Sequence, residues 1–229
     1  LLAVVSSPKQ VTIKNVSAHP DVEFAIRTLQ ERGVEITEHK KGEYIVNSKG
    51  DLHGGEVMIR GDIDETVFWA VCAVHTRGEL TIENVSSSDI TPFLSKLTQI
   101  GVQFKLEKNS LTLWCEDIKE LSPISIDIKP YPGIIPEWAG WLLILFNRIN
   151  GTSTLIQTSR LDKMTYLSAL KLLSMEIGVN NFEETKDGNV YPHEIKVFGG
   201  ASLAGAEVKT TTLRDGLVVL LAALGAQGT

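Results

Sequence analysis

The sequence predicts an α+β fold built from repeated strand–helix–strand units around buried central helices. Three observations predict it. A segment of about seventy residues recurs along the chain, each copy opens with a strand pattern and an amphipathic helix, and each copy closes with a helix that is apolar nearly all round. A helix without a polar face is usually buried on all sides. Each copy should therefore donate one helix to a shared interior, with sheets and amphipathic helices outside.

The opening strand carries the clearest self-similarity. Residues 11–16, VTIKNV, return as 80–85, LTIENV, and more weakly as 154–158, TLIQT. Each stretch alternates apolar and polar side chains, which is the period of a half-buried strand. Three copies of one structural unit are therefore expected.

An amphipathic helix follows each opening strand, because apolar residues recur there on one helical face. Gly33 and Gly101 stop the first two helices, since a left-handed residue after a helix costs glycine little. Gly178 is expected to end the third. These helices are predicted over 21–33, 88–101 and 165–178.

Short strands and a second helix complete each copy. The strands are expected at 43–46 and 56–59, at 110–114 and 124–128, and at 194–198 and 206–209. The apolar second helices are expected at 65–75, 137–148 and 213–224. Trp69, Trp138 and Trp141 lie in these helices, so they are interpreted as core residues and not as stacking platforms.

Composition excludes several classes of protein. Of the 229 residues, 43% are hydrophobic and 22% are charged, which is ordinary for a globular chain and excludes disorder and a disulfide scaffold. The balance of 22 Lys+Arg against 28 Asp+Glu gives a net charge of −6. With no basic run longer than Lys40-Lys41, no nucleic-acid partner is expected. The apolar run 217–224 is far below the roughly 20 residues that span a bilayer, so no membrane partner is expected.

The residues that hold metals and cofactors are sparse. Cys72 and Cys115 lie in apolar stretches, which is typical of reduced core thiols and points to a cytoplasmic location. The five histidines lack metal-ligand spacing, so no metal is expected. No glycine-rich phosphate or dinucleotide motif is present, so no cofactor is expected.

Several motifs resemble those of the enolpyruvyl transferases, in order and spacing and over essentially the whole chain. They lie at 50–55 (GDLHGG), 127–133 (DIKPYPG), 150–154 (NGTST), 203–208 (LAGAEV) and 213–228. The resemblance implies that family's fold, two lobes that are each an inside-out α/β barrel of three such units. Residues 1–59 would then be the end portion of the first lobe, and residues 60–229 most of the second.

The resemblance is strongest to the branch of the family that acts on UDP-N-acetylglucosamine. It implies transfer of the enolpyruvyl group of phosphoenolpyruvate to the 3-hydroxyl of that sugar nucleotide, in peptidoglycan precursor synthesis. A carboxylate would take the hydroxyl proton. Cationic side chains would hold the phosphate and carboxylate groups. Both substrates are therefore expected as partners.

Four residues match site positions of the family. Glu137 stands at a substrate-contacting Asp and is the expected catalytic carboxylate, although an acid that favours a helix N-terminus is equally open. Lys163 stands at an anion-contacting Arg, without the fork of a guanidinium, and a solvated surface Lys is the alternative. Arg214 matches a second anion-contacting Arg, or forms a structural ion pair. Ser159 matches a backbone contact to the nucleotide.

Departures from the family pattern leave a second hypothesis open. Arg60-Gly61-Asp62 stands where the family has Pro-Asp-Arg, Thr212 replaces an Asp, and neither cysteine matches the family's loop Cys. A diverged, non-catalytic homologue that acts as a binding or structural module would tolerate these changes.

The ends of the chain interrupt the repeat. The first residues, LLAVV, resemble the last turn of a preceding buried helix, and residues 228–229 stand where a fourth strand would begin. We therefore expect a fragment that lacks the N-terminal part of the same chain, holds one wall of the active site and is inactive alone.

Overall fold

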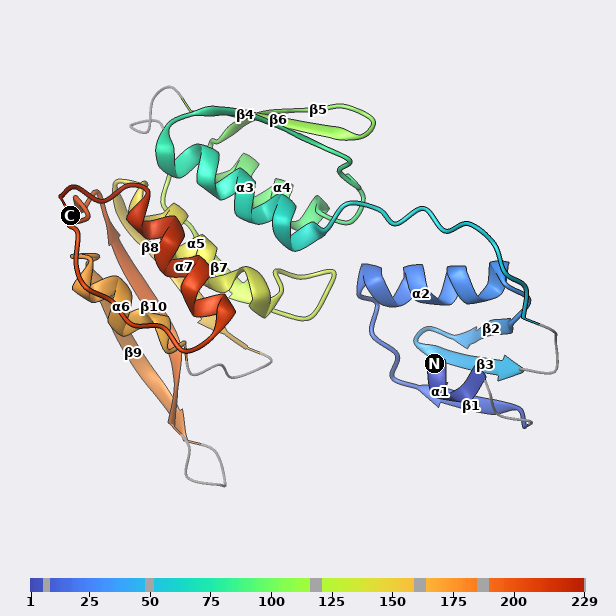
Figure 1. The fold of residues 1–229 in the computed structure, drawn as a ribbon. Helices are drawn as coiled ribbons and strands as arrows, with labels where there is room; N and C mark the ends of the chain where they lie inside the picture. Colours follow the sequence, from blue (N-terminus) through green and yellow to red (C-terminus); the bar gives the residue numbers. More distant parts are fainter. Residues whose placement is uncertain (6–8, 48–51, 116–120, 159–163, 185–189, 229) are drawn as a thin grey trace. The chain divides into compact units, whose positions relative to one another are not determined.

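The computed structural model describes residues 1–5, 9–47, 52–115, 121–158, 164–184 and 190–228 (Figure 1). The chain divides into two compact units. The first comprises Leu1–Ile59 with Pro130–Pro132, and the second comprises Arg60–Lys129 and Gly133–Thr229. The assignment of these two units to two lobes stays a prediction.

The first unit is a three-stranded antiparallel sheet with one long helix. Its strand order is β1-β3-β2, and Val11 is paired with Val46 in the register of β1 and β3. The helix α2 buries Ile26 against Val34, Ile36 and Val46. The elements are α1 (Leu2–Val5), β1 (Val11–Lys14), α2 (Pro20–Glu31), β2 (Glu35–Lys40) and β3 (Glu43–Asn47).

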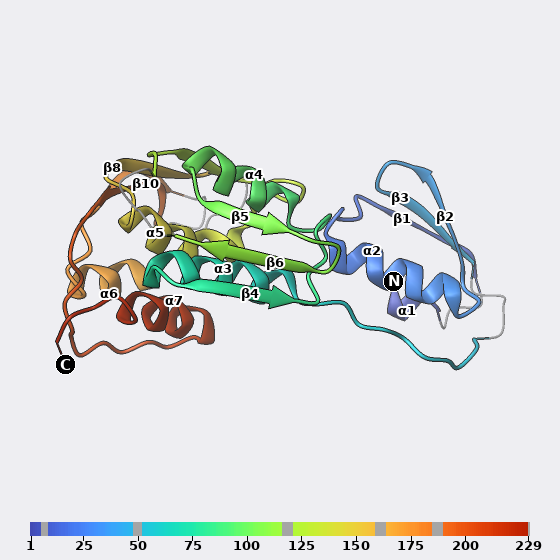
Figure 2. The same ribbon diagram turned by 90° about the horizontal axis from the view of Figure 1, so that it is seen from above.

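The second unit contains two sheets and a set of central helices (Figures 1 and 2). One sheet has the order β4-β6-β5 and the other β7-β8-β10-β9, in which β7 and β8 run parallel. Its strands are β4 (Glu79–Glu83), β5 (Gln103–Leu106), β6 (Ser110–Trp114), β7 (Ser125–Ile128), β8 (Gly151–Gln157), β9 (Ile177–Glu184) and β10 (Val190–Gly199). Its helices are α3 (Ile63–Thr76), α4 (Thr91–Ile100), η2 (Pro136–Trp138), α5 (Ala139–Asn147), α6 (Tyr166–Leu172) and α7 (Leu213–Ala223).

The same strand arrangement occurs in all three copies of the repeat. In each, the third strand lies between the first and the second, as β1-β3-β2, β4-β6-β5 and β8-β10-β9, with antiparallel pairing throughout. Asn15 and Asn84, which follow the first strands of two copies, both have positive φ, of 56° and 59°. Asn tolerates this conformation better than most residues, so the shared sequence letters reflect a shared turn.

The central helices differ in how completely they are covered. Helix α5 contacts α3, α7, β8 and β10, and all nine of its residues are buried. Helix α7 contacts α5 and α6, and its Leu213 and Leu220 are 82% and 54% exposed. Leu224, directly after the helix, is 53% exposed. The prediction of burial on all sides is therefore right for α5 and wrong for α7, because no described element covers the outer face of α7.

Two predicted strands are absent from the described residues. Residues 56–59 and 206–209 have no strand partner, and Met58 and Ile59 are 89% and 73% exposed. An alternating pattern forms a strand only where a neighbouring strand accepts its backbone hydrogen bonds. Near the second segment, the chain forms only an isolated parallel bridge between Ala204 and Gln227.

The third amphipathic helix is shorter than predicted. Helix α6 ends at Leu172, and Gly178 lies inside strand β9 and does not stop the helix. Ser174, with a φ of 65°, supplies the left-handed residue after the helix instead. The backbone N–H of Met175 then donates to the carbonyl of Leu170, at 3.0 Å, which satisfies a terminal acceptor of the helix.

None of the helices among the described residues is long and apolar enough to cross a membrane.

Buried His75 makes stability depend on pH. It lies in the last turn of α3 with no exposed surface, and its Nε2 is 3.3 Å from the carbonyl oxygen of Ala222. Burial, and then the charge of Arg148, lower the pKa of His75 to about 4. The unfolded chain binds a proton near pH 6.5, so unfolding takes up a proton between pH 6.5 and 4. We expect the free energy of unfolding to fall by up to roughly 3 kcal/mol as the pH falls through this window.

Urea denaturation at a series of pH values measures this effect. His75→Leu should flatten the pH dependence, whereas His53→Gln, which removes an exposed histidine, should leave it unchanged. If the free energy of unfolding of the His75→Leu variant falls with pH as steeply as that of the unmodified protein, other groups cause the loss of stability in acid.

Candidate functional site

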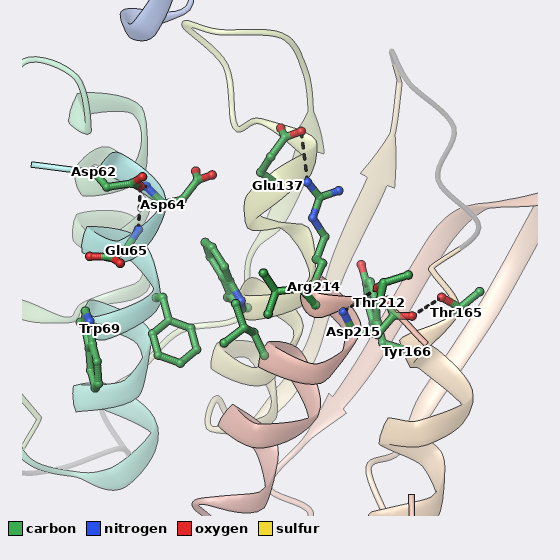
Figure 3. A pocket seen from close by; sticks show the side chains of 14 residues that line it. Asp62, Asp64, Glu65, Trp69, Glu137, Thr165, Tyr166, Thr212, Arg214 and Asp215 are labelled. Carbon is green, nitrogen blue, oxygen red and sulfur yellow. Dashed lines mark hydrogen bonds and ion pairs between the residues drawn. The ribbon is translucent and has the colours of Figure 1, made fainter. Parts of the chain in front are cut away.

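A pocket of about 700 Å³ opens at the N-terminal ends of several helices in the second unit (Figure 3). This volume lies within the range of roughly 300–1,000 Å³ that is usual for small-molecule sites. Its polar lining residues are Asp62, Asp64, Glu65, Glu137, Thr165, Thr212, Arg214 and Asp215. Its apolar lining residues are Phe68, Trp69, Trp141, Tyr166, Leu213 and Leu217.

The helix starts explain why so many polar residues meet here. Asp62 is the N-cap of α3, and its Oδ1 accepts from the backbone N–H of Asp64 at 2.7 Å and of Glu65 at 3.0 Å. Thr212 is the N-cap of α7, and its Oγ1 accepts from the N–H of Asp215 at 3.1 Å. Capping residues satisfy the free donors of a first helical turn. The two departures from the family pattern, at 62 and 212, therefore both serve as helix caps.

Two further hydrogen bonds tie neighbouring helices together around the pocket. The indole Nε1 of Trp138 donates to Asp64 Oδ1 at 2.8 Å, which joins η2 to α3. The hydroxyl of Thr165 donates to Asp215 Oδ2 at 2.7 Å, which joins the start of α6 to the first turn of α7. Because Asp215 is only 7% exposed, this second bond fixes the start of α7. The positions of Glu137 and Arg214 are thus set by well-anchored helix ends.

Glu137 and Arg214 form an ion pair across the pocket. Arg214 Nη2 lies 3.6 Å from Glu137 Oε1, and Figure 3 shows the two side chains reaching toward each other from η2 and α7. The Arg214 side chain is 44% exposed and that of Glu137 is 28% exposed. An ion pair this accessible to solvent contributes at most about 1 kcal/mol. It therefore leaves both groups able to exchange partners with a ligand.

The charge of the lining is unbalanced. Five carboxylates face the pocket, and Arg214 is the single cation among its described lining residues. The starts of α3 and α7 add positive partial charge beside the pocket, although the N–H groups of Asp64, Glu65 and Asp215 already donate to the capping side chains. An anionic ligand would be held by Arg214, with a smaller contribution from these two helix starts.

An aromatic wall forms the apolar side of the pocket. Phe68 stacks edge-on against Trp69 and Trp141, with ring centroids 5.3 and 5.7 Å apart. Trp138 and Trp141 are buried, as predicted, but Trp69 is 47% exposed and is not a core residue. The Nε1 of Trp141 has no hydrogen-bond partner among the described residues. A buried donor without a partner costs about 1–3 kcal/mol.

The structure brings together two of the four predicted site residues, Glu137 and Arg214. Ser159 and Lys163 lie outside the described residues. Sequence reasoning missed Asp64, Thr165 and Asp215. A signal was present for part of this set, because the spacings Asp62-x-x-Glu65 and Thr212-x-x-Asp215 are typical of capped helix starts. No cluster of three or more potential metal ligands occurs in the part of the chain that the structure describes.

Comparison with known proteins places these features in a family. The family model for EPSP synthase (3-phosphoshikimate 1-carboxyvinyltransferase) matches residues 1–229. The UDP-N-acetylglucosamine 1-carboxyvinyltransferase 1 of Caldanaerobacter subterraneus subsp. tengcongensis is 26% identical over 228 residues, covering 100% of this chain and 52% of the relative. The corresponding protein of Deinococcus radiodurans is 25% identical over 228 residues, covering 100% of this chain and 50% of the relative. The chain thus spans about half the length of the curated relatives it matches.

Solved structures share the fold. The enolpyruvyl transferase NikO from Streptomyces tendae superposes with a TM-score of 0.82 at 18% identity, over 98% of this chain and 51% of that one. An EPSP synthase from Acinetobacter baumannii superposes with a TM-score of 0.70 at 18% identity, over 100% of this chain and 53% of that one. The predicted α+β fold, an inside-out α/β barrel built from repeated units, is confirmed.

Proposed function

The chain belongs to the EPSP synthase family, and we propose that it forms one wall of the active site of a carboxyvinyltransferase. This enzyme would transfer the enolpyruvyl group of phosphoenolpyruvate to the 3-hydroxyl of UDP-N-acetylglucosamine, in the cytoplasm, as a step of peptidoglycan precursor synthesis. The curated relatives named UDP-N-acetylglucosamine 1-carboxyvinyltransferase support the choice of UDP-N-acetylglucosamine as the acceptor. The observation that carries the proposal is the meeting of Glu137 and Arg214, 3.6 Å apart in one pocket.

The proposed role of Glu137 is that of general base. Its carboxylate takes the proton of the attacking hydroxyl while the hydroxyl oxygen bonds to the substituted enol carbon of phosphoenolpyruvate. An acid from outside the described pocket protonates the methylene carbon, since neither Cys72 nor Cys115 lines this space. In the second half of the reaction, the same carbon loses a proton and the phosphate leaves. This restores the carbon–carbon double bond.

The proposed role of Arg214 is to hold an anionic group of phosphoenolpyruvate. A guanidinium can bind a phosphate or carboxylate through two parallel hydrogen bonds. The weak pairing with Glu137 allows the exchange, because the substrate anion offers stronger charge-assisted bonds than a partner 3.6 Å away. As Arg214 moves to the substrate, Glu137 is freed to accept the hydroxyl proton.

Substrate turnover tests the proposal. The 229-residue chain alone should release no phosphate from phosphoenolpyruvate with UDP-N-acetylglucosamine, since the described lining residues supply one cation, Arg214, and the acid is proposed to lie outside them. The full-length protein should release phosphate in proportion to the acceptor. Turnover by the chain alone would contradict the one-wall proposal, and no turnover by the full-length protein would contradict the enzyme.

A non-catalytic homologue is the second candidate function. The observation that favours it is the excess of carboxylates among the described lining residues, five against one arginine, in a pocket proposed for anionic substrates. Such a module would bind the sugar nucleotide, or no ligand of this class, without turnover. Calorimetric titration of UDP-N-acetylglucosamine into the full-length protein shows whether such a module binds the sugar nucleotide or does not bind it.

A further inference from the structure

A second, smaller pocket lies at the opposite ends of the same central helices. The first pocket is lined by the starts of α3 and α7, whereas this one is lined by Arg77 after the end of α3, by the end of α5, and by Gly225 and Gln227 after α7. Its volume is about 180 Å³, below the range of roughly 300 Å³ or more for drug-sized ligands. A nucleotide is therefore too large, and a small ion or molecule fits.

The charge of this pocket is opposite to that of the first. Arg77 and Arg148 line it, and no carboxylate occurs among its described lining residues. Burial, and then the positive charge of Arg77, lower the pKa of the Arg148 guanidinium from its usual value. A guanidinium nevertheless stays protonated in proteins. Two positive charges thus repel each other here, and a bound anion would relieve that repulsion.

Arg148 is held in place by two hydrogen bonds, and its other guanidinium N–H donors remain for a ligand. Its Nε donates to the carbonyl oxygen of His75 at 2.6 Å, and its Nη2 donates to the same oxygen. A guanidinium carries five N–H donors in a fixed fork, so these two bonds leave the others for a ligand. The backbone of the end of α3 therefore fixes the orientation of a cation in the pocket.

Asn147 supplies a side-chain acceptor that none of the described protein groups uses. Only 1% of this residue is exposed. Its backbone carbonyl oxygen accepts from the N–H of Gly200 at 2.8 Å, and its side-chain Nδ2 donates to the backbone carbonyl of Ala201 at 3.1 Å. Its Oδ1 has no hydrogen-bond partner among the described residues. A buried acceptor left unpaired is costly, so a ligand that donates a hydrogen to Oδ1 would remove that cost.

We propose that this pocket binds hydrogen phosphate, with Arg77 and Arg148 on its oxyanion oxygens and its hydroxyl donating to Asn147 Oδ1. The combination of two cations and one buried acceptor selects an anion that also carries an O–H group. Sulfate has the same shape and charge but no hydrogen at neutral pH, so it satisfies the arginines and not Asn147. The inference does not depend on the proposed function, which concerns the other pocket.

Isothermal titration of inorganic phosphate and of sulfate into the 229-residue chain, at pH 7.5 and low ionic strength, tests the proposal. Phosphate should bind at least about tenfold more tightly than sulfate. Arg77→Met and Arg148→Met should each weaken phosphate binding about tenfold or more, as expected for the loss of a charge-assisted contact. Asn147→Leu should abolish the preference for phosphate over sulfate.

Matched controls locate the site. Arg27→Met removes an exposed arginine of α2 and should leave phosphate affinity unchanged. The side chain of Arg77 makes no hydrogen bond among the described contacts, so Arg77→Met should not disturb folding. It therefore tests phosphate binding even if the Arg148→Met variant does not fold. Equal affinity for phosphate and sulfate would overturn the proposal. Binding that survives Arg77→Met but is lost in Arg214→Met would also overturn it, because the anion would then occupy the first pocket.

Discussion

Replacing Glu137 with Gln in the full-length enzyme is expected to lower kcat by about 100- to 10,000-fold, the contribution typical of a positioned general base. The amide keeps the size of the carboxylate but cannot take a proton from the attacking hydroxyl. The same change removes the negative charge 3.6 Å from Arg214 Nη2. Arg214 would then be freer to hold the substrate anion, so KM for phosphoenolpyruvate should not rise. The measurement is phosphate release at saturating concentrations of both substrates.

A structural role for Glu137 predicts a different outcome. As an acid in the first turn of η2 and a partner of Arg214, it would contribute at most about 1 kcal/mol to stability and nothing to kcat. The control is Glu83→Gln, which makes the same substitution on the exposed end of β4 and should leave kcat unchanged. A kcat for the Glu137→Gln variant within a few-fold of the unmodified enzyme would remove Glu137 from the chemistry.

Local patterns were sufficient to predict most of the fold. The alternation in residues 11–16 and 80–85 and the apolar faces behind them are properties of neighbouring residues, and both strands form in the predicted copies. Residues 56–59 show the limit of such patterns. Their three consecutive apolar residues also favour a strand, but a strand needs a partner, and pairing is decided by residues distant in the sequence. The prediction that α7 is buried on all sides was wrong for the same reason, because its burial depends on which other elements cover it.

The sequence could predict which residues belong to the candidate site but not how they are arranged in space. The motif match predicted Glu137 and Arg214 as site residues, which stays a prediction, whereas their pairing requires η2 and α7 to begin beside each other. That arrangement is set by contacts such as the hydrogen bond between Thr165 and Asp215, which joins different helices and leaves no mark in the local sequence. The prediction that Trp69 is a core residue was wrong because its helix is apolar overall, although Trp69 lies on the side of α3 that lines the pocket, with Asp64, Glu65 and Phe68.

The largest effect on stability is expected at Leu142, in the middle of α5. Its side chain has no exposed surface, and its helix is buried on all sides. Leu142→Ala should lower the free energy of unfolding by about 3–5 kcal/mol, because the substitution loses buried apolar surface and leaves a cavity. That is a large share of the roughly 5–15 kcal/mol that stabilises a typical domain. All four tryptophans lie in the second unit, so their fluorescence during urea denaturation follows the unit that contains Leu142.

Leu220 in α7 is the matched control, since it makes the same substitution in the equivalent helix of another copy. This side chain is 54% exposed, so Leu220→Ala removes little buried surface and also places a better helix former in the helix. We expect a change below about 1 kcal/mol. A loss as large as that at Leu142 would mean that the outer face of α7 is covered in solution. If a second copy covers it, the loss should shrink as the protein is diluted, because an association contributes to stability only in proportion to the concentration of its partner.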